Sequence, residues 1–102
     1  DSRLTIWWPS INKRSVWKNV YDTNTGEINE INTDPEKNKN HINYLIDKDE
    51  TRITFLYRKD VLGFKAYKFC GVYKINKNRS STENKAVWDC ISKNFNLETC
   101  EY

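Results

Sequence analysis

Apolar and polar positions alternate along much of the chain, and this period of two predicts β-strands. The first run, RLTIWW (Arg3–Trp8), is β-branched and aromatic and stops before Pro9, which cannot donate to a sheet ladder. Two further runs, SVWKNVYD (Ser15–Asp22) and EINEIN (Glu27–Asn32), flank the turn TNTG, whose glycine can adopt a positive φ. The pattern therefore predicts one strand followed by a hairpin. In the first strand Trp7 and Trp8 must point to opposite faces, so only one of them is expected in the core.

A helix is predicted where the alternation breaks. Asp34 precedes Pro35, which is the order of an N-cap residue and a proline at the first helical position. We expect one short helix from about Pro35 to Leu45. The polar segment KNRSSTENK (Lys77–Lys85) has turn composition and predicts a loop.

The longest alternating stretch is RITFLYRKDVLGFKAYKFCGVYKIN (Arg52–Asn76), which predicts a second hairpin turning at Gly63. If its returning strand alternates without interruption, one face is aromatic and the other carries lysines. The aromatic face, which we expect to form the core, holds Tyr67, Phe69, Gly71, Tyr73 and Ile75. The half-exposed lysine face holds Ala66, Lys68, Cys70, Val72 and Lys74.

The last apolar run, AVWDCISKNF (Ala86–Phe95), fits both a helical face and a strand, and its Val, Trp and Ile residues favour the strand. Five or six strands and one short helix place the chain in a mostly β, α+β class. The architecture predicted is a small, twisted, partly closed antiparallel β-barrel.

Length and composition limit the organisation of the chain. At 102 residues it is expected to be a single β-rich domain over residues 1–102, with 14% aromatic residues supplying much of the core volume. The chain opens on Asp1 and contains no Met, which suggests a domain excised from a longer protein. No apolar run approaches the roughly 20 residues that cross a bilayer, so we expect no membrane partner. The three cysteines are an odd number without tight spacing, which is typical of reduced thiols, and we expect a cytoplasmic protein.

Charge is distributed unevenly. Residues 1–51 hold seven basic and nine acidic side chains, whereas residues 52–102 hold ten basic and five acidic ones. Within residues 52–79, eight basic side chains stand against Asp60 alone. This concentration on the second hairpin is more informative than the net charge of +3.

Catalytic and metal-binding patterns are weak. The single histidine, His41, stands in the polar segment NKNHINY without a flanking Gly-rich loop. Cysteines 70, 90 and 100 lie at least ten positions from one another and from His41, unlike the close pairs of structural zinc sites. Asp60 and the ENK tripeptide Glu83–Lys85 could supply the carboxylates and the lysine of a magnesium-dependent nuclease, but such tripeptides are common by chance. We expect no metal, no cofactor and no catalytic residues in the domain itself.

The clustered lysines and arginines are typical of a surface that binds phosphates, and exposed aromatic rings could stack on bases. A protein-contact surface and a plain solvated face, whose lysines only discourage aggregation, are the alternatives. Among these we expect contact with nucleic acid.

Two segments carry a resemblance to a known family. YKFCGVYKIN (Tyr67–Asn76), followed after a polar loop by AVWDCIS (Ala86–Ser92), resembles small β-rich domains attached to bacterial restriction-type nucleases, which are similar to SRA- and PUA-like barrels that read modified bases. The resemblance implies a DNA-recognition module of a restriction or defence protein, with DNA and the remainder of a larger chain as partners. A protein-interaction or inhibitor domain is the alternative, and a magnesium-dependent nuclease fragment is a second one.

The resemblance also implies site residues. A curved sheet would accept a flipped base on its concave side between aromatic rings, while a polar group reads the base edge. By position, the stacking and recognition residues would be Trp8, Trp17, Asn19, Tyr21 and Asp22. The phosphate-binding residues would be Arg58, Lys59, Lys65, Lys68 and Lys74.

Overall fold

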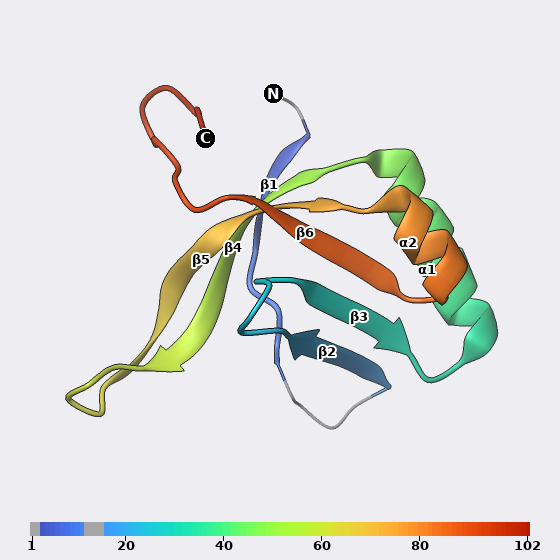
Figure 1. Cartoon of the computed structure of the whole chain (residues 1–102), viewed down its shortest axis with the longest axis horizontal. Coiled ribbons are helices and arrows are strands. Elements are labelled where there is room, and N and C mark those ends of the chain that lie inside the picture. Colours follow the sequence, from blue (N-terminus) through green and yellow to red (C-terminus); the bar gives the residue numbers. More distant parts are fainter. Residues whose placement is uncertain (1–2, 12–15) are drawn as a thin grey trace.

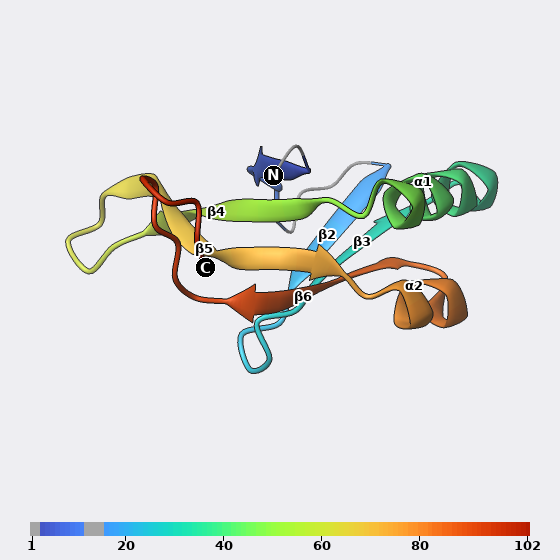
Figure 2. The ribbon, with the colours of Figure 1, turned by 90° about the horizontal axis from the view of Figure 1, so that it is seen from above.

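The computed structural model describes residues 3–11 and 16–102, which form a curled β-sheet with two helices near one end (Figure 1). A two-stranded arm, the hairpin of β4 and β5, projects from the opposite end (Figure 2). The expected strand start at Ser15 lies outside the described residues. In chain order the elements are β1 (Leu4–Trp7), β2 (Trp17–Tyr21), β3 (Ile28–Asn32), α1 (Pro35–Lys48), β4 (Thr51–Lys59), β5 (Lys65–Ile75), α2 (Lys77–Glu83) and β6 (Ala86–Ser92).

The described strands form one six-stranded sheet in the order β1-β4-β5-β6-β3-β2. All neighbours are antiparallel except β1, which runs parallel to β4. The edge strands β1 and β2 do not pair with each other, so the sheet is curled and open. This confirms the predicted mostly β, partly closed architecture and both predicted hairpins, and it adds one parallel pairing that the sequence pattern did not predict.

Helix α1 begins as its sequence predicts and ends later than expected. The carboxylate of Asp34 accepts hydrogen bonds from the backbone N–H groups of Glu36 and Lys37, and Pro35 occupies the first turn. The helix ends at Asp49, which adopts a left-handed conformation with φ of 50°. The buried residues of α1, which include Ile42 and Leu45, bring its apolar face against the sheet.

The predicted loop at residues 77–85 is wrong, because this segment contains helix α2. The side chain of Asn76 caps the helix by accepting a hydrogen bond from the backbone N–H of Arg79, and Asn84 ends it with φ of 55°. The buried hydroxyl of Ser80 accepts a hydrogen bond from the N–H of Val87, which ties the helix to β6. Neither α1 nor α2, nor any other helix in residues 3–11 and 16–102, is long and apolar enough to cross a membrane.

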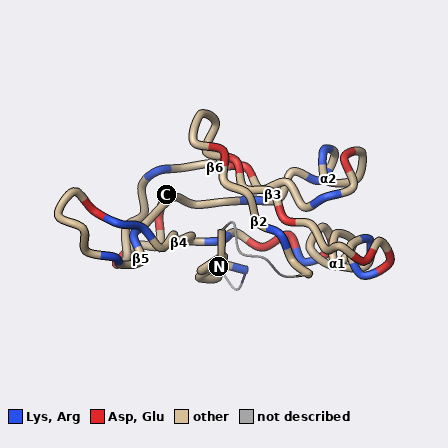
Figure 3. Tube along the Cα trace, turned by 90° about the horizontal axis from the view of Figure 1, so that it is seen from below, with Lys and Arg blue, Asp and Glu red and all other residues tan. Residues whose placement is uncertain are grey.

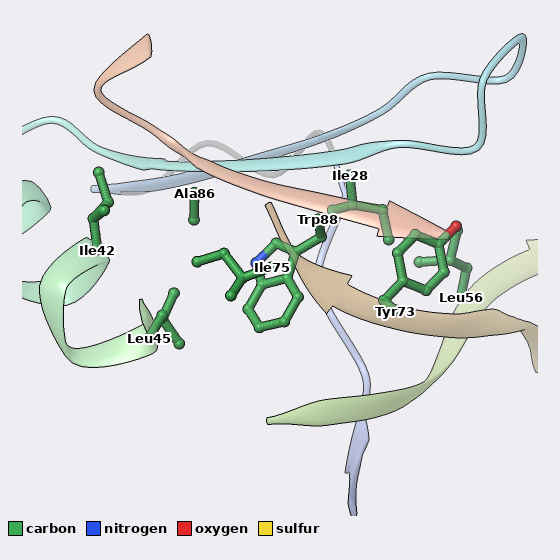
Figure 4. Close-up of a cluster of buried hydrophobic side chains, with 8 residues drawn as sticks. All are labelled: Ile28, Ile42, Leu45, Leu56, Tyr73, Ile75, Ala86 and Trp88. Atoms are coloured by element: carbon green, nitrogen blue, oxygen red, sulfur yellow. The ribbon is translucent and has the colours of Figure 1, made fainter. Parts of the chain in front are cut away.

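The core lies on the concave side of the sheet, which we call the inner face; the opposite side is the outer face. Trp88 is completely buried at the centre of the core. It belongs to strand β6, so the prediction of a strand for this segment is confirmed. Figure 4 shows the cluster, with contributions from α1 and from four strands: Ile28, Ile42, Leu45, Leu56, Tyr73, Ile75, Ala86 and Trp88. Trp7 packs on Trp88 with ring centroids 5.1 Å apart, and Trp8 is exposed, so the adjacent tryptophans point to opposite faces as predicted.

A β-bulge on β5 overturns the predicted single aromatic core face. Thr54 pairs with Gly71 but Phe55 pairs with Phe69, so one extra residue is inserted and the alternation of β5 changes face there. Tyr73 is therefore completely buried on the inner face, while Phe69 and Tyr67 stand on the outer face with exposed fractions of 39% and 53%. The uninterrupted alternation assumed from the sequence cannot describe this strand.

Candidate nucleic-acid interface

Strand β2 supplies three of the predicted recognition residues to the inner face. Its burial alternates, so Trp17, Asn19 and Tyr21 point inward while Lys18 and Val20 point outward. Trp17 and Tyr21 stand four residues apart, which is about 13 Å along a strand. They cannot be opposite walls of one base-sized cage on this strand.

An open pocket of about 240 Å³ lies where the end of β2 approaches the end of β4. The guanidinium of Arg58 sits over the ring of Tyr21 at 4.8 Å from its centroid, joining residues 37 positions apart in sequence. The pocket therefore combines an aromatic ring, a fixed positive charge and a hydroxyl. Its lining residues are Ile11, Tyr21, Thr23, Leu56, Tyr57 and Arg58.

Asn19 lies two residues before Tyr21 on the same face. Its Nδ2 donates a hydrogen bond to the backbone carbonyl of Ser10 at 3.1 Å. Its Oδ1 is buried and has no hydrogen-bond partner among the described residues. An unpaired buried acceptor costs free energy, so a hydrogen-bond donor that reaches this oxygen would be favoured.

Trp17 is held at the other end of β2, by α1. Its ring packs edge-on against the ring of His41, with centroids 4.5 Å apart. His41 Nε2 in turn lies 2.9 Å from Oε1 of Glu30 on β3. Trp17 and His41 thus connect the helix to the edge of the sheet.

Of the five predicted recognition residues, Tyr21 alone lines the inner-face pocket. Trp17 and Asn19 lie earlier on β2, and Trp8 and Asp22 are engaged elsewhere. Trp8 stacks on Phe55 on the outer face, with centroids 6.2 Å apart and an interplanar angle of 25°. The Oδ1 atom of Asp22 accepts hydrogen bonds from the backbone N–H groups of Asn24 and Thr25, which stabilises the turn between β2 and β3.

Figure 3 marks the basic residues along the backbone of the arm, and the strand register divides their side chains between its two faces. Arg58 and Lys68 share the inner face with Leu56, because Lys68 pairs directly with Leu56 and Arg58 follows it by two residues. Lys59 and Lys65 pair with each other one position further out, on the outer face. Each face of the arm therefore carries its own pair of cations.

Lys74 lies at the helical end of β5, away from the tip of the arm. Its Nζ is 3.3 Å from Oδ1 of Asp49, and Lys77 approaches the other carboxylate oxygen at 3.5 Å. Burial alone would raise the pKa of Asp49, but hydrogen bonding and charge from the two lysines outweigh it and lower the pKa. The predicted cation at this position is engaged in an ion pair.

The most deeply placed cation of the inner face is Arg52, which sequence reasoning did not single out. Its guanidinium lies 4.2 Å from the ring centroid of Trp88 and 4.7 Å from that of Trp7. Burial lowers its pKa, an effect opposed by Glu30 and Glu50, and an arginine in this setting stays charged. Nothing in the local sequence marks this arginine, because only the fold brings the two tryptophan rings around it.

The carboxylates of the nuclease reading are far apart. Asp60 lies at the tip of the arm, where its Oδ1 accepts hydrogen bonds from the N–H groups of Leu62 and Phe64. Glu83 ends α2 at the other end of the molecule, where it pairs with Arg79 (Figure 1). In the part of the chain that the structure describes, no three His, Cys, Asp or Glu side chains gather in a way that could hold a metal ion.

Comparisons with known proteins agree with this geometry. The model of the SET and RING associated (SRA) domain family matches residues 1–97. A solved structure, the 5-hydroxymethylcytosine-specific restriction enzyme AbaSI, is similar with a TM-score of 0.70 and 26% sequence identity. The likeness covers 87% of this chain and 28% of that chain, so the domain spans little more than a quarter of that enzyme. Among curated proteins, none matches the chain.

Proposed function

The chain belongs to the SRA domain family, and we propose that the pocket between β2 and β4 receives a modified base flipped out of duplex DNA. The class of function, recognition of DNA and of modified bases by a domain of restriction type, follows from the family and from the likeness to AbaSI. The resemblance noted in the sequence is thereby confirmed. The particular base and the residues that read it are our proposal.

The observation that carries the proposal is the contact between Tyr21 and Arg58 at the pocket. The guanidinium of Arg58 covers one face of the Tyr21 ring, so a flipped base would stack on the other face while the cation attracts its phosphate. We assign Asn19 the role of reading the base edge, because its unpaired Oδ1 can accept from the exocyclic amine of a cytosine. The hydroxyl of Thr23 in the pocket wall can bond a polar group added at the base.

The base we propose is 5-hydroxymethylcytosine, the modification named for AbaSI. Its hydroxymethyl group needs a hydrogen-bonding partner that neither cytosine nor 5-methylcytosine requires, and Thr23 can be that partner. Arg58 and Lys68 share the inner face at this point and are the proposed phosphate contacts beside the pocket.

We further propose that the domain works within a larger restriction protein of the cytoplasm, whose cleavage chemistry lies outside these residues. The arrangement of Asp60 and Glu83 at opposite ends of the molecule supports a recognition role (Figure 1). Other residues of such a protein would then act on the DNA that this domain has bound.

The test compares binding to three matched duplexes carrying cytosine, 5-methylcytosine or 5-hydroxymethylcytosine at one position, by fluorescence anisotropy at two salt concentrations. We expect the hydroxymethylated duplex to bind tightest, and Tyr21→Ala to remove most of that preference while leaving sequence-independent binding in place. The control is Tyr44→Ala, a tyrosine of α1 that is 55% exposed and distant from the pocket. Equal affinity of the wild-type domain for the three duplexes would refute the proposal, and so would an unchanged preference in Tyr21→Ala.

A further inference from the structure

The outer face of the arm presents aromatic side chains to solvent in ordered pairs. Tyr57 and Tyr67 pair across the two strands with ring centroids 5.1 Å apart, and Phe55 and Phe69 pair at 5.9 Å. Trp8 extends the second pair by stacking on Phe55. The exposed fractions are 58% for Tyr57, 53% for Tyr67, 39% for Phe69 and 54% for Trp8. These rings form a continuous aromatic surface on the outer face of the arm, and Tyr57 also borders the pocket.

The pairs are regularly spaced. The two aromatic pairs lie two residues apart on each strand, which is about 6.6 Å. That spacing is close to the length of one nucleotide step in an extended single strand. A strand lying along the arm would therefore meet a new aromatic pair with each base or two.

The charge of this face suits a polyanion. Lys59 and Lys65 pair with each other directly beyond Tyr57 and Tyr67 and share their face, so the aromatic pairs end in a pair of cations. The outer-face positions of the arm, residues 55, 57 and 59 on β4 and 65, 67 and 69 on β5, include no acidic side chain. The nearby carboxylate of Asp60 is engaged by backbone N–H groups of the turn.

Cross-strand aromatic pairs also stabilise a hairpin, but that role does not require the lysines to share their face. Aromatic planes combined with a positively charged track are the features by which proteins bind single-stranded nucleic acid without reading its sequence. Aromatic rings could also bind a protein partner, but Lys59 and Lys65 at the end of the patch make no ion pair with any residue that the structure describes, and this favours phosphate.

We propose that the outer face of the arm binds single-stranded nucleic acid, as a second site that acts independently of the inner-face pocket. Phe55 and Phe69, extended by Trp8, stack on one base, Tyr57 and Tyr67 stack on the next, and Lys59 and Lys65 contact the phosphates. The site covers about three nucleotides, one for each aromatic pair and one for the lysine pair. This goes beyond the proposed function, which concerns a base in duplex DNA on the other face.

The experiment measures anisotropy of a fluorescein-labelled oligothymidylate against the wild-type domain and Tyr67→Leu, which removes the aromatic plane and keeps apolar bulk. Tyr57 is left unchanged because it also lines the pocket. We expect Tyr67→Leu to weaken binding by about tenfold, within the range found for loss of one base–aromatic stack. Tyr44→Leu, at an equally exposed tyrosine of α1, is the matched control and should bind as the wild type does.

A second arm tests the cations. The double variant Lys59→Gln/Lys65→Gln should lower the dependence of log affinity on log salt for the oligothymidylate by about 1.4, because each phosphate contact to a single strand contributes about 0.7. Lys39→Gln on the exposed surface of α1 is its control. An unchanged salt slope in the double variant would overturn the phosphate assignment.

Several other results would overturn the proposal as a whole: no binding of the wild-type domain to the oligothymidylate, the same affinity in Tyr67→Leu, or displacement of the oligothymidylate by the hydroxymethylated duplex. Sedimentation showing a self-association that Tyr67→Leu abolishes would instead assign the face to a second copy of the chain. Failure here is distinguishable from failure of the proposed function, because Tyr67→Leu should retain the preference for the modified duplex.

Discussion

The close approach at Gly71 can be tested by adding a single methyl group. A Cβ at this position would lie 2.7 Å from Sγ of Cys90 and 2.9 Å from the backbone carbonyl oxygen of Ser92. The φ angle of 156° is also one that side-chain-bearing residues rarely adopt. Gly71→Ala should therefore strain both the bulge of β5 and its contact with β6.

Two terms set the size of the effect. Residues held in a sparsely populated backbone region cost about 1–3 kcal/mol, and overpacking costs about 1–3 kcal/mol more. We therefore expect Gly71→Ala to lower the free energy of unfolding by about 2–6 kcal/mol. Gly63→Ala is the matched control: its φ is 90°, but the added Cβ would meet only Cε of Lys59, at 3.6 Å. The free energy of unfolding of Gly63→Ala should therefore fall only by the cost of backbone strain, about 1–3 kcal/mol.

The assay is urea unfolding followed by tryptophan fluorescence, since Trp88 reports on the core. The double variant Gly71→Ala/Cys90→Ala should be less destabilised than the sum of its single changes, because the smaller side chain removes the Sγ contact and leaves the carbonyl contact of Ser92. If Gly71→Ala costs no more than Gly63→Ala, the close approach does not constrain this position and the reasoning fails.

Three further predictions follow from contacts elsewhere in the fold. Tyr73→Phe should lower the free energy of unfolding by about 1–3 kcal/mol in the same urea assay. The hydroxyl donates a hydrogen bond to the carbonyl of Gly26 at 2.5 Å, and its loss leaves a buried acceptor unpaired. An unchanged urea midpoint would contradict this. In anisotropy titrations Lys68→Ala should weaken binding to all duplexes alike and reduce the slope of log affinity against log salt by about one. Lys74→Ala is the control: the ammonium of Lys74 pairs with Asp49, so its loss should leave duplex binding unchanged. Burial would raise the pKa of Asp49, but Lys74 and Lys77 lower it below the ordinary carboxyl range. The stability that this ion pair contributes is therefore present above the ordinary carboxyl pKa and lost as the pH falls through the depressed value. Thermal unfolding between pH 6 and pH 2 should show a smaller acid loss in Lys74→Ala than in the wild type, and equal losses would refute the assignment.

Local signals in the sequence were sufficient for most of the elements. Alternation located the strands, and the Asp34–Pro35 pair located the start of α1. Helix α2 was missed because it is only seven residues long and polar, with Ser80 as its buried residue, so it has no apolar stripe for a periodicity argument to detect. Its cap, Asn76, was the available local signal.

Two residues of the pocket could be predicted from the sequence, but their contact could not. Tyr21 was expected to stack and Arg58 to bind phosphate, on separate grounds. In the six-stranded sheet β2 is an edge strand and β4 lies next to the opposite edge. The contact between Tyr21 and Arg58 therefore depends on how strongly the sheet curls. Strand order and curl come from pairings between distant segments, and no single run of residues encodes them.

The division of the arm's charge shows how one inserted residue changes the meaning of a sequence pattern. Read as an unbroken alternation, the arm has one aromatic face for the core and one basic face for a partner. The bulge beside Gly71 lets Tyr73 enter the core while Tyr67 stays in solvent, so the outer face keeps its aromatic rings and acquires a lysine pair of its own. The inner face has a separate pair of cations, Arg58 and Lys68, beside the pocket. A basic cluster that looks like one surface in the sequence is thus divided between two faces, which is why we expect duplex binding and single-strand binding to respond to different substitutions.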